Sequence, residues 1–220
     1  MKFRILATSV VCVVFTIGFV LSVFAQGLKP IQLPEPKLDP SKSLVQALKD
    51  RQTSREYAGD KLPEQMLSNL LWAAWGINRP DTGKRTAPSA VNWQETDVYV
   101  STTMGMYLYD PKGNVLVPVL PGDNRALTYT QVERFKDAPL NLVYVADFQK
   151  MGDADEARKI MLASMDTGFI AENVYLYCAS ENLPTCFRVS IDKEKLGQAL
   201  KLRPTQRIMG AQSVGLPKGK

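Results

Sequence analysis

The sequence predicts an α+β fold in which a largely antiparallel central sheet is flanked by helices. Leucines and tryptophans recur at four-residue spacing in 63–77, which indicates a core-facing helix. Residues 96–102, 106–110 and 115–120, separated by turns, predict a β-meander. Helices and strands also mix without the strict βαβ order of a parallel sheet. The 220 residues, 45% of them hydrophobic, suffice for one domain with one core.

Residues 1–25 predict a secretory signal peptide. Lys2 and Arg4 precede the uncharged apolar run 5–24, and a cleavage site follows Ala25. Because this run could also cross a bilayer, an uncleaved anchor is the alternative, and it would be the chain's one membrane contact. In either case the basic start predicts an exported domain, periplasmic or otherwise extracytoplasmic.

Residues 26–42 predict a proline-rich linker, since four prolines fall within 26–40. The folded domain is expected to cover 43–220. It should begin with a short amphipathic helix over 43–49, followed by the helix that Pro63 opens.

The second half of the domain predicts further alternating elements. Residues 168–180 are apolar on almost every face, which indicates a helix packed on several sides. The other expected elements are helices over 128–136, 154–164 and 192–202, and strands over 140–147, 185–191 and 206–215.

Composition excludes several classes of protein. The chain has no histidine, which removes Ser-His-Asp and Cys-His catalysis and the commonest transition-metal ligand. We therefore expect no metal site and assign no catalytic side chain. No basic stripe with interleaved aromatic residues is present, so nucleic-acid binding is not expected. In an exported domain Cys178 and Cys186 could form a disulfide, and two buried thiols are the alternative.

The stretch RQTSREY, residues 51–57, is the first candidate site. Arg51 and Arg55 flank the hydroxyls of Thr53 and Ser54, and guanidinium and hydroxyl donors match phosphate oxygens. A short solvated basic segment would use the same residues.

The stretch KRTAPSAVNWQ, residues 84–94, is the second. The Pro88-Ser89-Ala90 turn could bring its backbone close to a planar ligand. Asn92 and Gln94 offer side-chain amides that could hydrogen-bond to polar atoms at the edge of a heteroaromatic ring. A plain polar connection between helix and strand is the alternative.

The third candidate is Asp166-Thr167-Gly168. If a helix starts here, Thr167 and Gly168 present free backbone N–H groups that suit an electron-rich ligand atom.

The order of these motifs resembles the nitroreductase superfamily of flavin oxidoreductases. The matching patterns are R-x-T-S-R-x-Y, A-P-S-A-x-N-x-Q, D-x-G-F-I-A-E-N-x-Y-L and a final V-G-L-P, from about residue 43 to the end. The Gly76-Ile77-Asn78-Arg79 and Lys84-Arg85 context is similar to the branch that includes the SagB-type dehydrogenases.

The resemblance implies a nitroreductase-like α+β fold, an intertwined homodimer, and FMN bound at the subunit interface. It implies that the first motif holds the phosphate and ribityl chain, that the second lines the ring, and that the third places donors near the reactive nitrogen. The residues implied are Arg51, Gln52, Thr53 and Arg55; Pro88, Ser89, Ala90 and Asn92; and Thr167 and Gly168. The sequence departs from many members in that their further basic residues beyond the last strand, which complete the phosphate site, have no match here, and Lys218 is the expected substitute.

The implied function is an exported FMN-dependent oxidoreductase. It would take electrons from a small-molecule donor and pass them in a ping-pong cycle to a nitroaromatic- or quinone-like acceptor. The donor stays open, because nicotinamide dinucleotides are not expected outside the cytoplasm. The alternatives are a flavin-binding or remodelled ligand-binding module without turnover, and a flavin-free interaction domain.

Overall fold

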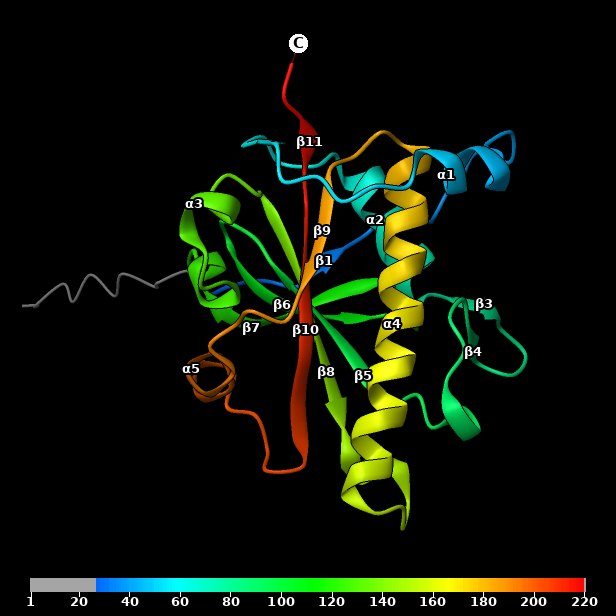
Figure 1. Ribbon diagram of the computed structural model, residues 1–220, viewed down its shortest axis with the longest axis vertical. Helices are drawn as coiled ribbons and strands as arrows, with labels where there is room; N and C mark the ends of the chain where they lie inside the picture. Colours follow the sequence, from blue (N-terminus) through cyan, green and yellow to red (C-terminus); the bar gives the residue numbers. More distant parts are fainter. Residues whose placement is uncertain (1–26, 220) are drawn as a thin grey trace, which may run out of the picture.

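The computed structural model describes residues 27–219 and contains a seven-stranded antiparallel sheet (Figure 1). The expected signal segment 1–25 lies outside the described residues. In sheet order the strands are β1 (Ile31–Gln32), β7 (Val115–Pro121), β6 (Gly105–Asp110), β5 (Thr96–Ser101), β8 (Leu140–Asp147), β10 (Gln206–Val214) and β9 (Thr185–Arg188). All neighbouring pairs are antiparallel. The predicted fold class and the predicted meander of β5, β6 and β7 are confirmed.

The central strands bury both faces because helices cover each side. All eight residues of β8 are buried. Since successive side chains point to opposite faces, Leu142 and Tyr144 enter one core and Val143 and Val145 the other.

Helices lie on both faces of the sheet. On one face, α2 (Glu64–Trp75) packs against α4 (Glu156–Ser180), and both contribute to the main core. On the other face, α5 (Lys193–Ala199) buries Leu196 in the second core. The short helix α1 (Leu44–Asp50) lies against α4.

Helix α4 is longer than predicted. The sequence suggested a helix over 154–164 and a second one starting near Asp166, but a single helix begins after Asp155, whose carboxylate accepts the Arg158 N–H at 2.9 Å. Asp166 lies inside this helix, and its carboxylate accepts the Ala90 N–H of a different segment at 2.8 Å. One glycine, Gly168, costs a helix only about 1 kcal/mol, so nothing local ends it.

The predicted helix over 128–136 is confirmed only over one turn, Val132–Phe135. The chain forms a 3-10 turn η2 (Arg125–Thr128), an extended residue at Tyr129 and a one-turn helix α3 (Val132–Phe135). The Thr128 carbonyl accepts from the buried Arg188 guanidinium at 3.0 and 3.2 Å. That bond takes the acceptor which a continuing helix would need.

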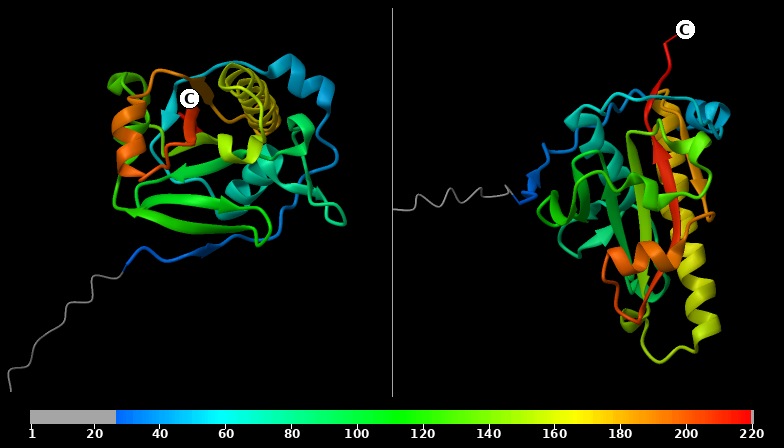
Figure 2. Two further views of the ribbon diagram at one scale, coloured as in Figure 1. Left: turned by 90° about the horizontal axis from the view of Figure 1, so that it is seen from below. Right: turned by 90° about the vertical axis from the view of Figure 1, so that its left-hand side faces the viewer.

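Part of the expected linker belongs to the domain. Ile31 and Gln32 form β1 at the sheet edge, opposite Leu116 and Val115, and Figure 2 shows this blue segment running along the outside of the green strands. Leu33 is buried in the main core. Prolines are tolerated here because an edge strand leaves one row of backbone donors unused.

Two small ladders were not predicted. Tyr57–Ala58 (β2) pairs with Leu216–Pro217 (β11), and Ile77–Arg79 (β3) pairs with Lys84–Arg85 (β4). The described part of the chain contains no helix long and apolar enough to cross a membrane.

Replacing Leu33 by Ala should lower the free energy of unfolding by about 2–4 kcal/mol, because the side chain is 3% exposed and leaves a cavity. Leu38→Ala is the matched control in the same segment, since Leu38 is 41% exposed. Urea denaturation of both variants measures the difference. Equal midpoints would show that the segment before Ser41 does not contribute to the core.

Candidate active site

The first candidate motif forms a cationic corner against α4. Arg51 caps the end of α1, where its N–H donates to the Ala47 carbonyl at 2.9 Å. Its guanidinium lies over the ring of Tyr175, 5.5 Å from the centroid. The Tyr175 hydroxyl also bonds Thr53 Oγ1 at 3.1 Å and accepts the Phe187 N–H at 2.9 Å. Tyr175 therefore fixes the motif to α4 and to β9.

The Arg51 guanidinium is held without being neutralised. Among the described residues it makes no side-chain hydrogen bond and no ion pair, although its stacking on Tyr175 limits where it can point. A cation kept in place with all its donors free is suited to an anionic ligand.

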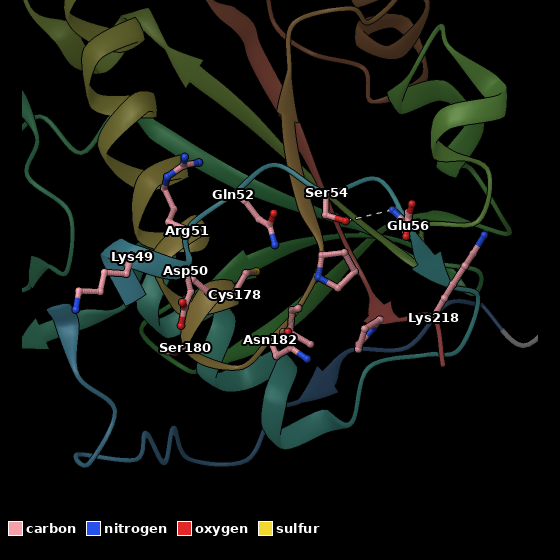
Figure 3. Close-up of a pocket in the computed structure, with 14 residues that line it drawn as sticks. Lys49, Asp50, Arg51, Gln52, Ser54, Glu56, Cys178, Ser180, Asn182 and Lys218 are labelled. Atoms are coloured by element: carbon pink, nitrogen blue, oxygen red, sulfur yellow. Dashed lines mark hydrogen bonds between the residues drawn. The ribbon is translucent and has the colours of Figure 1, made fainter. Parts of the chain in front are cut away.

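A cavity of about 670 Å³ opens beside Arg51. Figure 3 shows Arg51, Gln52, Ser54 and Lys218 around it. The β2–β11 ladder explains why Lys218 is there, because pairing of Pro217 with Tyr57 brings the C-terminal strand beside residues 49–56. Lys218 lies 4.0 Å from Asp137, an exposed and loose pairing.

Two predicted members of this site lie off the cavity. Thr53 faces Tyr175. Arg55 lies near Cys186, where burial raises the pKa of the thiol and the positive charge of Arg55 opposes that rise. Both Cys178 and Cys186 are free and buried, which matches the second of the two expected outcomes for this pair.

The second motif forms a compact loop after the β3–β4 hairpin. Arg85 donates to the Gln94 side chain at 2.8 Å and to the Trp75 carbonyl at 3.3 Å, and burial lowers its pKa from the ordinary value. Gln94 in turn donates to Gly83 at 3.1 Å. Arg85 and Gln94 therefore shape the loop from within.

The loop backbone is strained at its tip. Ala90–Asn92 form a 3-10 turn, η1, and Val91, Asn92 and Gln94 have φ of 54°, 59° and 48°. These left-handed conformations are costly for residues other than glycine and persist only where neighbours fix them.

Two buried carboxyl groups anchor this loop. The Ala90 N–H donates to Asp166 Oδ2 at 2.8 Å, and Ser89 Oγ donates to Glu95 Oε2 at 3.2 Å while accepting the Gln94 N–H at 2.8 Å. Pro88, Val91 and Asn92 remain exposed. A cavity of about 340 Å³, lined by Pro88, Ser89 and Asn92, opens beside them.

Thr167 and Gly168 do not lie at a helix start. They occupy the middle of α4, where backbone N–H groups bond carbonyls one turn back and are not free for a ligand. Thr167 is buried, and its hydroxyl has no hydrogen-bond partner among the described residues. Gly168 is exposed, and a Cβ there would meet no atom within 4 Å in the part of the chain that the structure describes.

The structure thus brings the predicted residues together as two clusters. Tyr175 marks the cationic corner and Asp166 the loop, about 14 Å apart along α4 at about 1.5 Å per residue. Figure 1 shows α1 beside one end of α4 and the β3–β4 hairpin further down the helix. Tyr175 and Glu95 were not predicted as site residues, and Asp166 was predicted only as part of the third motif, without its contact to Ala90.

Among the described residues no group of histidine, cysteine or acidic side chains is placed to hold a metal ion. The Arg51 cluster offers hydrogen-bond donors for an anion. The 88–92 loop offers donors and acceptors for the polar atoms at the edge of a planar ring.

Comparisons with known proteins agree with this architecture. The model of the Nitroreductase family matches residues 48–216. A nitroreductase-like protein of Methanocaldococcus jannaschii is 28% identical over 182 residues, which cover 79% of this chain and 90% of that protein.

Solved structures show the same fold. A nitroreductase-like protein from Ralstonia eutropha has a TM-score of 0.82 at 34% identity, covering 87% of this chain and 90% of that one. A chain in the Escherichia coli microcin synthetase complex McbBCD has a TM-score of 0.69 at 20% identity, covering 96% and 85%, a likeness of fold alone. Because the family model spans most of the sequence and the Ralstonia structure shares a third of its residues, this chain belongs to the nitroreductase family of oxidoreductases.

Proposed function

We propose that this chain is an exported FMN-dependent oxidoreductase that works as a homodimer and reduces nitroaromatic- or quinone-like acceptors. The observation that carries the proposal is the free, fixed Arg51 guanidinium beside a large cavity. Export is supported by the sequence of residues 1–25.

The cationic corner fits the phosphate of FMN. Arg51 and Lys218 supply charge, and Gln52 and Ser54 supply polar groups for the phosphate and ribityl oxygens. Charge-assisted hydrogen bonds of this kind are stronger than neutral ones. Thr53 would not bind the phosphate itself. Its hydroxyl bonds the Tyr175 hydroxyl and so helps to keep that ring beneath Arg51.

The 88–92 loop fits the flavin ring. Its exposed Pro88 and Val91 offer flat apolar contact, and Asn92 offers an exposed amide. The Thr86 hydroxyl, which lines the adjoining cavity, is buried without a hydrogen-bond partner among the described residues. An unpaired buried hydroxyl beside a cavity fits a polar ring atom.

A second copy of the chain would complete the site. Met161, Met165 and Phe169 form an exposed stripe at four-residue spacing along α4, each about half exposed, and we call it the α4 stripe. On α1, Leu44, Val45 and Leu48 are 63%, 62% and 56% exposed. The sequence predicted that residues 168–180 pack on several sides, and in one chain Phe169 of this segment is 47% exposed. A partner helix at this face would bring the loop of one chain toward the corner of the other.

The protein's own contribution to the reaction is binding, orientation and exclusion of water. The bound flavin would supply the transfer of electrons between donor and acceptor. Arg51 and Lys218 would hold its anionic end, the 88–92 loop would support its ring, and the α4 stripe would shield the site once the partner is in place. The chain has no histidine, and no side chain is assigned as a catalytic acid or base.

Replacing Arg51 by Ala should weaken FMN binding at least tenfold, because a lost charge-assisted bond costs about 1.5–3 kcal/mol. Arg134→Ala is the matched control, since Arg134 is exposed on α3, outside the cavity. Quenching of flavin fluorescence during titration measures both affinities. Unchanged affinity in Arg51→Ala would contradict the phosphate placement.

Replacing Met165 by Glu should dissociate the dimer and weaken FMN binding, because a charge buried in an apolar interface costs several kcal/mol and raises the dimer Kd about a hundredfold or more. Val132→Glu serves as control, because Val132 is 53% exposed on α3. Sedimentation velocity gives the oligomeric state and the visible spectrum gives the retained flavin. A wild-type monomer that binds FMN fully would contradict the shared site, and bound flavin that never turns over would indicate the binding module.

A further inference from the structure

Two buried carboxyl groups meet beneath the 88–92 loop. Glu95 is fully buried just before β5, and Asp166 is 3% exposed on the inner side of α4. Glu95 Oε2 accepts from Ser89 Oγ at 3.2 Å, and Asp166 Oδ2 accepts the N–H of the next residue, Ala90, at 2.8 Å, so the two carboxyl groups converge on one pair of consecutive residues. Acidic side chains are almost never fully buried unless a partner compensates their charge.

Within residues 27–219 no cation forms an ion pair with either carboxyl group. The basic groups on the neighbouring elements are engaged elsewhere. Lys150 of the 3-10 turn η3 (Phe148–Met151) binds Asp97 at 3.1 Å, Arg85 binds Gln94, and Arg203 binds Asp147, whose N–H donates to the Glu95 carbonyl.

Two adjacent buried carboxylates cannot both stay ionised without a cation. Burial, and after it the nearby negative charge of Asp166, raises the pKa of Glu95 above its ordinary 4.5. A proton held between the two groups removes the repulsion and satisfies an oxygen of each carboxyl. The remaining oxygens then stay free for the loop.

Each carboxyl group holds one residue of the loop. Asp166 Oδ2 accepts the Ala90 N–H at 2.8 Å, and Glu95 Oε2 accepts from Ser89 Oγ at 3.2 Å. Thr96 Oγ1 reaches Glu95 Oε1 at 3.5 Å. Because the adjoining residues 91 and 92 have positive φ, the loop keeps its shape only while such anchors persist.

We propose that Glu95 and Asp166 share one proton, and that this proton-bearing pair positions the 88–92 loop for the cofactor ring. The shared proton stands on the structure alone, whereas its role toward the ring rests on the proposed function. When the proton leaves, the two carboxylates repel each other and move apart. Their hydrogen bonds to Ser89 and Ala90 are then distorted, and the loop loses its shape. Glu95 and Asp166 are positioning residues, since they act through the loop.

The proton makes stability fall as the pH rises. Because the pKa of Glu95 is raised in the folded state, the folded chain binds more protons than the unfolded chain above about pH 4.5. The stabilisation is fully present below that pH and is lost as the pH rises through the folded-state pKa. Glu95→Gln carries a fixed neutral group and should not show this loss.

The first test is urea unfolding of cofactor-free protein between about pH 5 and about pH 9. The wild-type midpoint should fall with rising pH relative to that of Glu95→Gln, so that the two curves are not parallel. Glu35→Gln is the control, because Glu35 is exposed and its curve should run parallel to the wild type. Parallel curves for the wild type and Glu95→Gln would overturn the proposal.

Two further measurements guard against a variant that fails to fold. Asp166→Asn removes the neighbouring negative charge but leaves Glu95 buried, so it should reduce the pH dependence without abolishing it. At a pH above the ordinary pKa of a glutamate, the infrared difference spectrum between the wild type and Glu95→Gln should show a protonated carboxyl band that shifts in D₂O. Absence of that band in folded wild-type protein would also overturn the shared proton.

The last test measures FMN affinity against pH. Wild-type affinity should fall at high pH by up to about tenfold per pH unit relative to Glu95→Gln, which shares every other titrating group. FMN bound with equal pH dependence in both would overturn the positioning role. If neither protein binds FMN at any pH, the proposed function fails, and the unfolding and infrared results still decide the shared proton.

Discussion

Both halves of the candidate site depend on the continuity of α4. This 25-residue helix carries Asp166, which binds the loop backbone, and Tyr175, which supports Arg51. Ile170 and Val174 lie between them and are completely buried against the sheet. The helix is thus fixed by the core, and the spacing of the two clusters is fixed with it. A break at 166–168 would move one cluster relative to the other.

The sequence predicted those elements whose local pattern decides their structure. The alternating strands β5, β6 and β7 and the four-residue spacing of α2 suffice without knowledge of neighbours. The misjudged segments are those in which distant residues decide. The Arg188 guanidinium donates to the Thr128 carbonyl and so ends the helical turn there. The local sequence by itself would let that turn continue. The β1 edge strand exists because β7 offers a partner, which no feature of a proline-rich segment shows.

The same distinction holds for the site. Motif order pointed to Arg51, Gln52 and the 88–92 loop, and the structure places each beside a cavity. It also placed Thr167 and Gly168 at a helix start, whereas both lie in the middle of α4. Tyr175 and Glu95 were not predicted, because their roles come from contacts with residues that are distant in the sequence or visible only in the fold: Tyr175 supports Arg51, and Glu95 binds Ser89. A single acidic residue before a strand gives no signal until its buried neighbour is known.

Because the two clusters lie far apart along one rigid helix, the proposed dimer has a genetic consequence. Each cofactor would draw its anchor from one polypeptide and its ring support from the other. A chain defective only in the corner and a chain defective only in the loop could then rescue each other when co-expressed, since their heterodimer keeps one of its two centres whole.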